Sequence, residues 1–303
     1  VIENARSIPG FFEFFGIAKP VVVDGVQQIS GEAPVFGEAG SYGFLTVIST
    51  MAWGLGYFGM PQVLLRFMAI DKASSLKRSR RVATVWVVIS LAAATMIGII
   101  GRAVFPTALT SSAEAESIFI LLSRSFLPPI IAGLILSGIL AATISSSDSY
   151  MLIAASAVSK NIYAGVLKKD ASDKKVLLLT RVVLALIAVV GILIALDENS
   201  VIFTIVSFAW AGFGATFGPL VLFSLFWKRM TYPAAIAGMV SGGVMVFVWK
   251  LLIKPMGGVF GIYELLPAFV ISCLVIIAVT LCTRKPEQAI TDDFDKVNAK
   301  MAA

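Results

Sequence analysis

The sequence of 303 residues is poor in histidine, cysteine and charge. It contains no histidine, which excludes imidazole metal sites, Ser–His hydrolytic pairs and phosphorylated histidine within this chain. Its two cysteines, Cys273 and Cys282, lie in one apolar run and predict free thiols rather than a disulfide framework. No P-loop, CxxC, kinase or hydrolase motif is found, so the sequence does not indicate an enzyme.

Charged residues make up 14% of the chain, where soluble domains carry roughly a quarter. Hydrophobic residues reach 58%, and the mean hydropathy is +0.92. Several apolar runs attain the roughly 20 residues that cross a bilayer. A soluble protein would need polar sequence to cover these runs, and too little is present. The sequence therefore predicts an all-α, polytopic membrane protein.

The apolar runs predict seven spans, at about 43–68, 82–104, 128–160, 175–196, 200–227, 232–253 and 264–283. A short amphipathic helix is expected over 117–128, at the membrane interface. We expect residues 1–42 to form an extracellular or periplasmic loop with short structured pieces. The transmembrane domain then covers 43–283, and 284–303 form a charged, frayed cytoplasmic tail.

The net charge of +6 is distributed as a topology signal rather than as a nucleic-acid surface. Basic residues gather in the loops at 71–81 and 160–175 and after the fifth and seventh spans, at Lys228, Arg229, Arg284 and Lys285. With seven alternating spans, these four places share one side of the membrane. The positive-inside rule makes that side, and hence the C-terminus, cytoplasmic in the cell membrane. The acidic turn at 196–200 is then outside.

The third predicted span carries an unusual polar stripe. Small and hydroxyl residues are spaced i, i+3, i+4 and i+7, on one helix face, at Ala142, Ser145, Ser146 and Ser149. Asp148 borders this face, and an ionisable group within a span marks a functional site by default. Oxygen ligands of this kind fit a hard cation, and a weak monovalent site fits a transporter. The alternative is that the hydroxyls bond the carbonyl four residues back or a neighbouring helix.

The first predicted span is interrupted by three glycines and Pro61. Such a break is tolerated in a membrane only where protein or water lines it, and broken helices hold substrates in secondary transporters. Trp53 and Tyr57 lie four residues apart beside the break and predict an aromatic wall for a small ligand. The alternative for Trp53 is an interfacial anchor near a helix end.

The fifth predicted span also mixes aromatic residues with glycine. Ser207 and Trp210 are candidate pocket-lining residues. Gly212, Gly214 and Gly218 are expected to allow close helix packing. The G-x-G spacing does not indicate a dinucleotide site, because no strand precedes it.

Three long stretches resemble the sodium/solute symporter family: AWGLGYFGMPQVLLRFMA, GILAATISSSDSYMLIAASAVSKNIY and SFAWAGFGATFGPLVLFSLFWKRMT. The similarity runs from about Ala52 to Glu287 and is closest to the proline-transporting members. The resemblance implies two inverted five-helix repeats plus flanking helices. Spans one to five would form the second repeat, and spans six and seven the flanking pair. Because the first residue is Val1 and no signal peptide opens the sequence, we expect that an N-terminal part is missing.

The resemblance also implies a sodium site. In the family, a helix carbonyl and two adjacent hydroxyls bind sodium, and these fall on Ala142, Ser145 and Ser146. The remaining ligands would come from the missing first repeat. The family's proline transporters carry an uncharged residue where this chain has Asp148. We therefore predict that Asp148, with Ser145 and Ser149, forms a second cation site or a proton-linked group.

The implied function is sodium-coupled symport of L-proline, or of a closely related small amino acid, by alternating access. The family's aromatic and proline positions on the broken helix fall on Trp53, Tyr57 and Pro61. The expected partners are the sodium ion, L-proline and the lipid bilayer, with no nucleic acid and no obligate protein partner evident. The alternatives are a sodium symporter for a carboxylate or pantothenate, a symporter-like sensor, and a fragment that moves no substrate alone.

Overall fold

The computed structural model describes residues 16–302, except for 32, 73 and 197–200. Its only described strands are short and precede the first described helix: β1 (Gly16–Pro20), β2 (Val22–Val23), β3 (Val26–Gln27), β4 (Ile29–Ser30), β5 (Ala33–Pro34) and β6 (Phe36–Ser41). β2 pairs antiparallel with β3, and β4 with β5. The predicted short structured pieces before the first span are therefore present.

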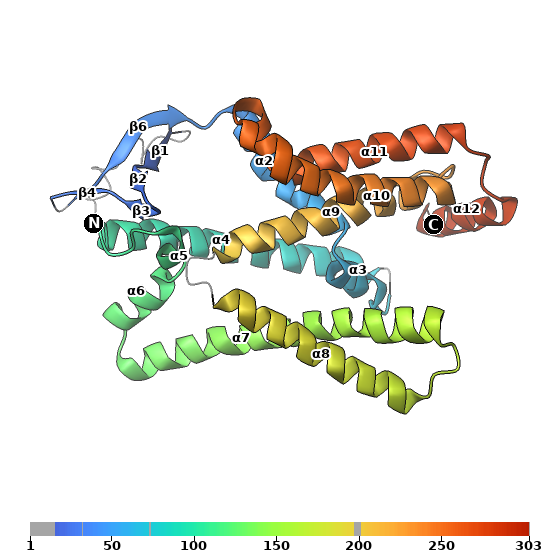
Figure 1. Cartoon of the computed structure of the whole chain (residues 1–303), viewed down its shortest axis with the longest axis horizontal. Coiled ribbons are helices and arrows are strands. Elements are labelled where there is room, and N and C mark those ends of the chain that lie inside the picture. Colours follow the sequence, from blue (N-terminus) through green and yellow to red (C-terminus); the bar gives the residue numbers. More distant parts are fainter. Residues whose placement is uncertain (1–15, 32, 73, 197–200, 303) are drawn as a thin grey trace. The chain divides into compact units, whose positions relative to one another are not determined.

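Helices form nearly all of the remaining described chain (Figure 1). They are α2 (Phe44–Met51), η1 (Ala52–Phe58), α3 (Pro61–Met68), α4 (Ser75–Val104), α5 (Ser112–Ala115), α6 (Ile118–Phe126), α7 (Pro129–Ser156), η2 (Ala157–Leu167), α8 (Asp173–Ala195), α9 (Ile202–Phe226), α10 (Tyr232–Val248), η3 (Trp249–Ile253), η4 (Lys254–Met256), η5 (Gly258–Gly261), α11 (Leu265–Cys282) and α12 (Gln288–Ala302). The all-α membrane class is confirmed.

Six described helical segments are long and apolar enough to cross a membrane, and they coincide with predicted spans two to seven. The first predicted span differs, because it is divided into α2, η1 and α3. α6 confirms the short helix expected over 117–128. Apart from Leu196, the predicted acidic turn lies outside the described residues.

Two predictions about the extent of helix are wrong. Lys160 was assigned to a loop, but the third span continues as the π-helix η2 to Leu167. Ser159 accounts for this continuation: its hydroxyl donates to the Ala155 carbonyl at 2.8 Å and accepts from Thr180 of α8 at 2.7 Å. The tail, expected to be frayed, forms α12.

The chain divides into two compact units, described separately. The first is built mainly from 19–38 and 87–201. In it, α7 with η2 packs against α8. The strand region is held at the C-terminal end of α4, where the Arg102 guanidinium donates to the Leu109 carbonyl and to the Gln27 side chain.

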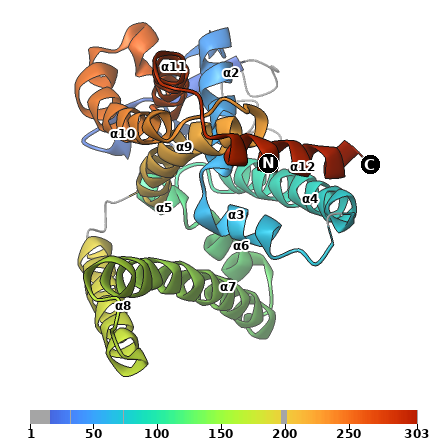
Figure 2. The same cartoon turned by 90° about the vertical axis from the view of Figure 1, so that its right-hand side faces the viewer.

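The second unit is built mainly from 39–86 and 202–303. Its helices α9, α10 and α11 lie side by side in both views (Figures 1 and 2). Small residues bring the backbones together: a Cβ on Gly242 of α10 would lie 2.2 Å from the Ala215 carbonyl oxygen of α9. The buried core of this unit comprises Ala211, Ala215, Val246, Leu265, Ala268 and Phe269. This three-helix core contacts η1 through α9 and α11 and therefore positions the broken helix.

Candidate functional site

The break in the first predicted span is confirmed and has a local cause. Residues 52–58 form a 3₁₀-helix, and Met60 is extended, with φ −82° and ψ 116°. A proline disfavours helical geometry at the preceding residue, so the helix cannot continue through Met60. Pro61 then opens α3 at the position where its missing N–H costs least.

Three of the predicted substrate residues form one aromatic cluster in the second unit. The Trp53 and Trp210 rings stack with centroids 5.5 Å apart and an interplanar angle of 13°. Tyr57 meets Trp210 edge-on at 4.8 Å. The Trp210 indole N–H donates to the Trp53 backbone carbonyl at 3.0 Å. This hydrogen bond joins η1 and α9 directly.

Glycines permit this contact between η1 and α9. A Cβ on Gly56 would lie 1.9 Å from Nε1 of Trp210, and one on Gly214 would lie 2.7 Å from the Gly56 Cα. The predicted packing role is thus confirmed for Gly214, and also for Gly218, which faces the Phe269 ring. It is wrong for Gly212, where a Cβ would meet nothing within 4 Å.

The cluster contains residues that sequence reasoning missed. The Tyr263 ring stacks on Trp53 at 5.7 Å, and Phe203 stacks on Trp53 at 5.4 Å. The Tyr263 hydroxyl donates to the Ser207 carbonyl at 2.6 Å, which joins this predicted residue to the cluster through its backbone. Tyr263 follows a glycine-rich turn, where no periodicity assigns a side chain to a helix face, so the sequence held no signal for it.

The cluster is partly open to its surroundings. Trp53 and Trp210 are half-buried, and Tyr57 is 51% exposed. Aromatic faces of this kind can contact the apolar body of a small ligand. Burial raises the pKa of the Tyr263 phenol, and the neighbouring Glu264 charge raises it further, so this hydroxyl keeps its proton and remains a donor.

The polar stripe lies on α7 in the first unit, with all five predicted cation-site residues exposed there. The Ser149 hydroxyl donates to the Ser145 carbonyl at 3.1 Å, which is the back-bonding alternative. Within the described part of the chain, the hydroxyls of Ser145 and Ser146 have no hydrogen-bond partner. They differ in this from Ser137 and Thr143 on the same helix, which bond the carbonyl four residues back.

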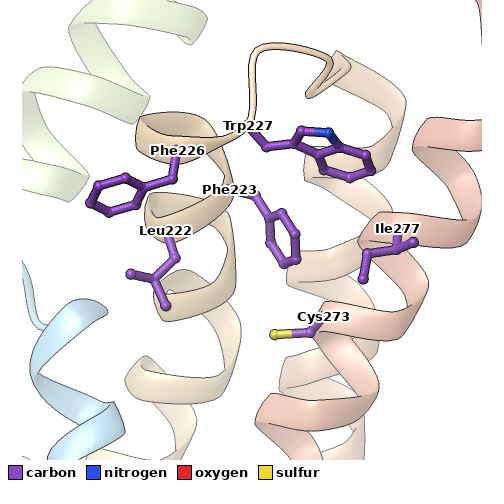
Figure 3. Close-up of a pocket in the computed structure, with 6 residues that line it drawn as sticks. All are labelled: Leu222, Phe223, Phe226, Trp227, Cys273 and Ile277. Carbon is purple, nitrogen blue, oxygen red and sulfur yellow. The ribbon is translucent and has the colours of Figure 1, made fainter. Parts of the chain in front are cut away.

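A pocket of about 600 Å³ lies between α9 and α11 (Figure 3). Its lining is apolar and comprises Leu222, Phe223, Phe226, Trp227, Cys273 and Ile277. None of the predicted substrate residues contributes to it. With no charged side chain in the lining, the pocket has nothing to pair with the charged groups of an amino acid, so it is not the candidate substrate site.

Comparisons with known proteins point to one family. The model of the sodium:solute symporter family matches residues 13–242. A sodium/proline symporter of Haemophilus influenzae is 45% identical over 256 residues, which cover 83% of this chain and 51% of the relative. The high-affinity proline transporter PutP of Bacillus subtilis is 39% identical, over 85% of this chain and 54% of its own length. A sodium/proline symporter of Escherichia coli is 36% identical, over 97% of this chain and 56% of its own length.

The chain thus spans about half the length of the curated relatives it matches. The matched family region includes all of η1, α3, α7 and α9, on which the predicted site residues lie.

Proposed function

This chain belongs to the sodium:solute symporter family, and we propose that it supplies part of a secondary active transporter that couples sodium to the uptake of L-proline. The observation that carries the proposal is the aromatic cluster at the helix break, where Trp53, Tyr57 and Trp210 meet. The names of the relatives favour proline over a carboxylate or pantothenate. They describe transporters, in keeping with a protein that performs no covalent chemistry.

The substrate side of the proposal uses the broken helix. The rings of Trp53, Tyr57 and Trp210 would contact the apolar pyrrolidine ring of proline. Pro61, which opens α3 at the break, and Ser207 of α9, whose carbonyl accepts from Tyr263, would line the same site.

The sodium side uses α7. The Ala142 carbonyl and the hydroxyls of Ser145 and Ser146 would provide oxygen ligands, and the two hydroxyls are not occupied by back-bonding. Asp148 and Ser149 form the candidate second cation site. The Ser149 hydroxyl would bind an ion through its oxygen lone pairs while it donates its hydrogen to the Ser145 carbonyl. Neutral oxygen ligands bind a monovalent ion weakly enough for release on the other side.

The topology remains part of the proposal. Residues 1–42 would lie outside the cell, 43–283 would form the transmembrane domain, and 284–303 would lie in the cytoplasm. The positive-inside distribution of the basic loops supports this orientation. Transport would proceed by alternating access, in which the site opens to each side of the cell membrane in turn.

The test is uptake of labelled L-proline into proteoliposomes, with and without an inward sodium gradient. It requires a protein of the length of the matched relatives that contains this sequence. Ser145→Ala and Ser146→Ala should raise the sodium concentration needed for half-maximal uptake. Ser137→Ala is the matched control, because it removes a back-bonded hydroxyl from the same helix. Sodium-driven currents without proline uptake would reject the substrate, and uptake independent of sodium would reject the coupling.

A further inference from the structure

Tyr263 contacts three segments that surround the broken helix. Its ring stacks on Trp53 of η1, with centroids 5.7 Å apart and an interplanar angle of 17°. Its hydroxyl donates to the Ser207 carbonyl of α9 at 2.6 Å. Its backbone N–H donates to the Ser49 hydroxyl of α2 at 2.7 Å. Tyr263, two positions before α11, therefore connects α2, η1 and α9 next to Trp53, which is a proposed substrate-binding residue.

The next residue, Glu264, is anchored in an ion-pair cluster. Its side chain is 1% exposed, and its two carboxylate oxygens lie 2.8 Å from the Lys254 ammonium and 3.5 Å from the Lys250 ammonium. The Lys250 ammonium also lies 6.0 Å from the centroid of the Phe208 ring of α9. Glu264 occupies the N-cap of α11, where the helix dipole favours a negative charge.

The contacts of Tyr263 and the ion pairs of Glu264 depend on each other, because one peptide bond joins the two residues. The chain between the lysines and Tyr263 passes through Gly257 and Gly258, both with positive φ, and these glycines give the turn little rigidity of its own. The ion pairs of the buried Glu264 carboxylate therefore fix the position of the C-terminal end of this turn. Removing one partner of a buried pair leaves an uncompensated charge, which moves the backbone toward water.

We infer that Tyr263 is a positioning residue for the substrate site, fixing the Trp53 wall, and that the Glu264–Lys254–Lys250 cluster fixes Tyr263. This inference rests on the proposed function only in its consequence for transport. If the Trp53 ring is held in a fixed position, the space beside it admits ligands of only one size. Loosening it should weaken the preference for the five-membered ring of L-proline over the six-membered ring of L-pipecolate.

The test uses Tyr263→Phe, which keeps the ring and removes only the hydroxyl. The loss of one hydrogen bond corresponds to about a five-fold effect. We expect about five-fold faster amide hydrogen exchange in the peptide that covers 52–58. We also expect the KM for L-proline to rise about five-fold, with the maximal rate nearly unchanged, and a smaller ratio between the L-pipecolate and L-proline KM values. Tyr232→Phe is the control, because Tyr232 is 79% exposed at the start of α10.

A second pair of variants tests the cluster. Lys254→Met leaves Glu264 without its nearest cation and should accelerate exchange in 52–58 more than Tyr263→Phe does. Adding Glu264→Gln removes the stranded charge and should restore most of the protection. If Tyr263 and the cluster had a purely structural role, these variants would lower the amount of folded protein but would leave the KM for L-proline and the selectivity against L-pipecolate unchanged.

The outcomes separate the two proposals. If Tyr263→Phe matches Tyr232→Phe in both exchange and KM, Tyr263 does not position the wall. If exchange in 52–58 rises but even the unaltered protein transports no proline, the positioning role stands and the proposed substrate is rejected. Equal exchange in the Lys254→Met single variant and in the double variant would reject the role of the cluster.

Discussion

Substituting Gly56 by alanine tests the aromatic cluster most directly. The new Cβ would lie 1.9 Å from Nε1 and 2.4 Å from Cδ1 of the Trp210 indole. Carbon atoms in good contact are about 3.5 Å apart, so the indole must move by roughly 1.5 Å. A shift of this size breaks the 3.0 Å hydrogen bond from Trp210 to the Trp53 carbonyl, because such bonds are not maintained beyond about 3.5 Å.

The magnitude follows from what is lost. The hydrogen bond contributes about 1 kcal/mol, and the stacking of Trp210 on Trp53 contributes about 0.5–1.5 kcal/mol. Residual overpacking brings the total to about 2–4 kcal/mol. If all of it opposes substrate binding, the KM for L-proline rises roughly thirty-fold to several-hundred-fold. Any part that destabilises the fold instead appears as a lower melting temperature.

The assay is proteoliposome uptake together with thermal unfolding in detergent. Gly54→Ala is a matched control, because Gly54 lies in the same 3₁₀-helix and a Cβ there would meet nothing within 4 Å. It should leave KM and melting temperature nearly unchanged. Equal effects of the two substitutions, or normal behaviour of Gly56→Ala, would refute the argument that Trp210 lies directly on the backbone of the break.

Three further predictions concern separate features. Gly242→Ala places a Cβ 2.2 Å from the Ala215 carbonyl oxygen and should destabilise the fold by about 1–3 kcal/mol in thermal unfolding, whereas Gly212→Ala should not. The buried Glu264 carboxylate is paired with the Lys254 and Lys250 ammonium groups. Glu264→Gln removes this pairing and leaves both ammonium groups without their carboxylate, so it should lower the melting temperature in detergent, and an unchanged melting temperature would contradict a stabilising role of the cluster. Asp148→Asn should change the sodium stoichiometry or the pH dependence of uptake, and unchanged values would reject a second cation site.

The sequence predicted the architecture well where the signal is local. Six spans follow from runs of apolar residues, because a bilayer requires length and hydropathy that few other structures need. The break was predictable for the same reason, since Pro61 acts on its immediate neighbours. The errors at Lys160 and in the tail concern helix ends, where individual side-chain contacts decide. The hydrogen bond from Thr180 to Ser159 and the ion pair of Lys228 with Asp295 leave no periodic pattern.

The contacts among the predicted aromatic residues were not predictable from the sequence. Trp53, Tyr57 and Trp210 were each chosen because aromatic residues stand beside glycine in a span. Their meeting depends on the packing of η1 on α9, which local composition does not encode. Tyr263 shows the limit clearly, because its backbone bonds Ser49 across 214 positions and its own neighbourhood is an ordinary turn.

The hydroxyls of α7 show why a helix face alone does not define an ion site. Ser137, Thr143 and Ser149 bond the carbonyl four residues back, whereas Ser145 and Ser146 have no partner in the described chain. The same residue class on one helix thus adopts two states, which differ in where the hydroxyl hydrogen points, while the oxygen keeps its lone pairs in both. Back-bonding is available to every serine of a helix and fixes the direction of the hydroxyl hydrogen, as at Ser149, whereas the hydroxyls of Ser145 and Ser146 are not fixed in this way.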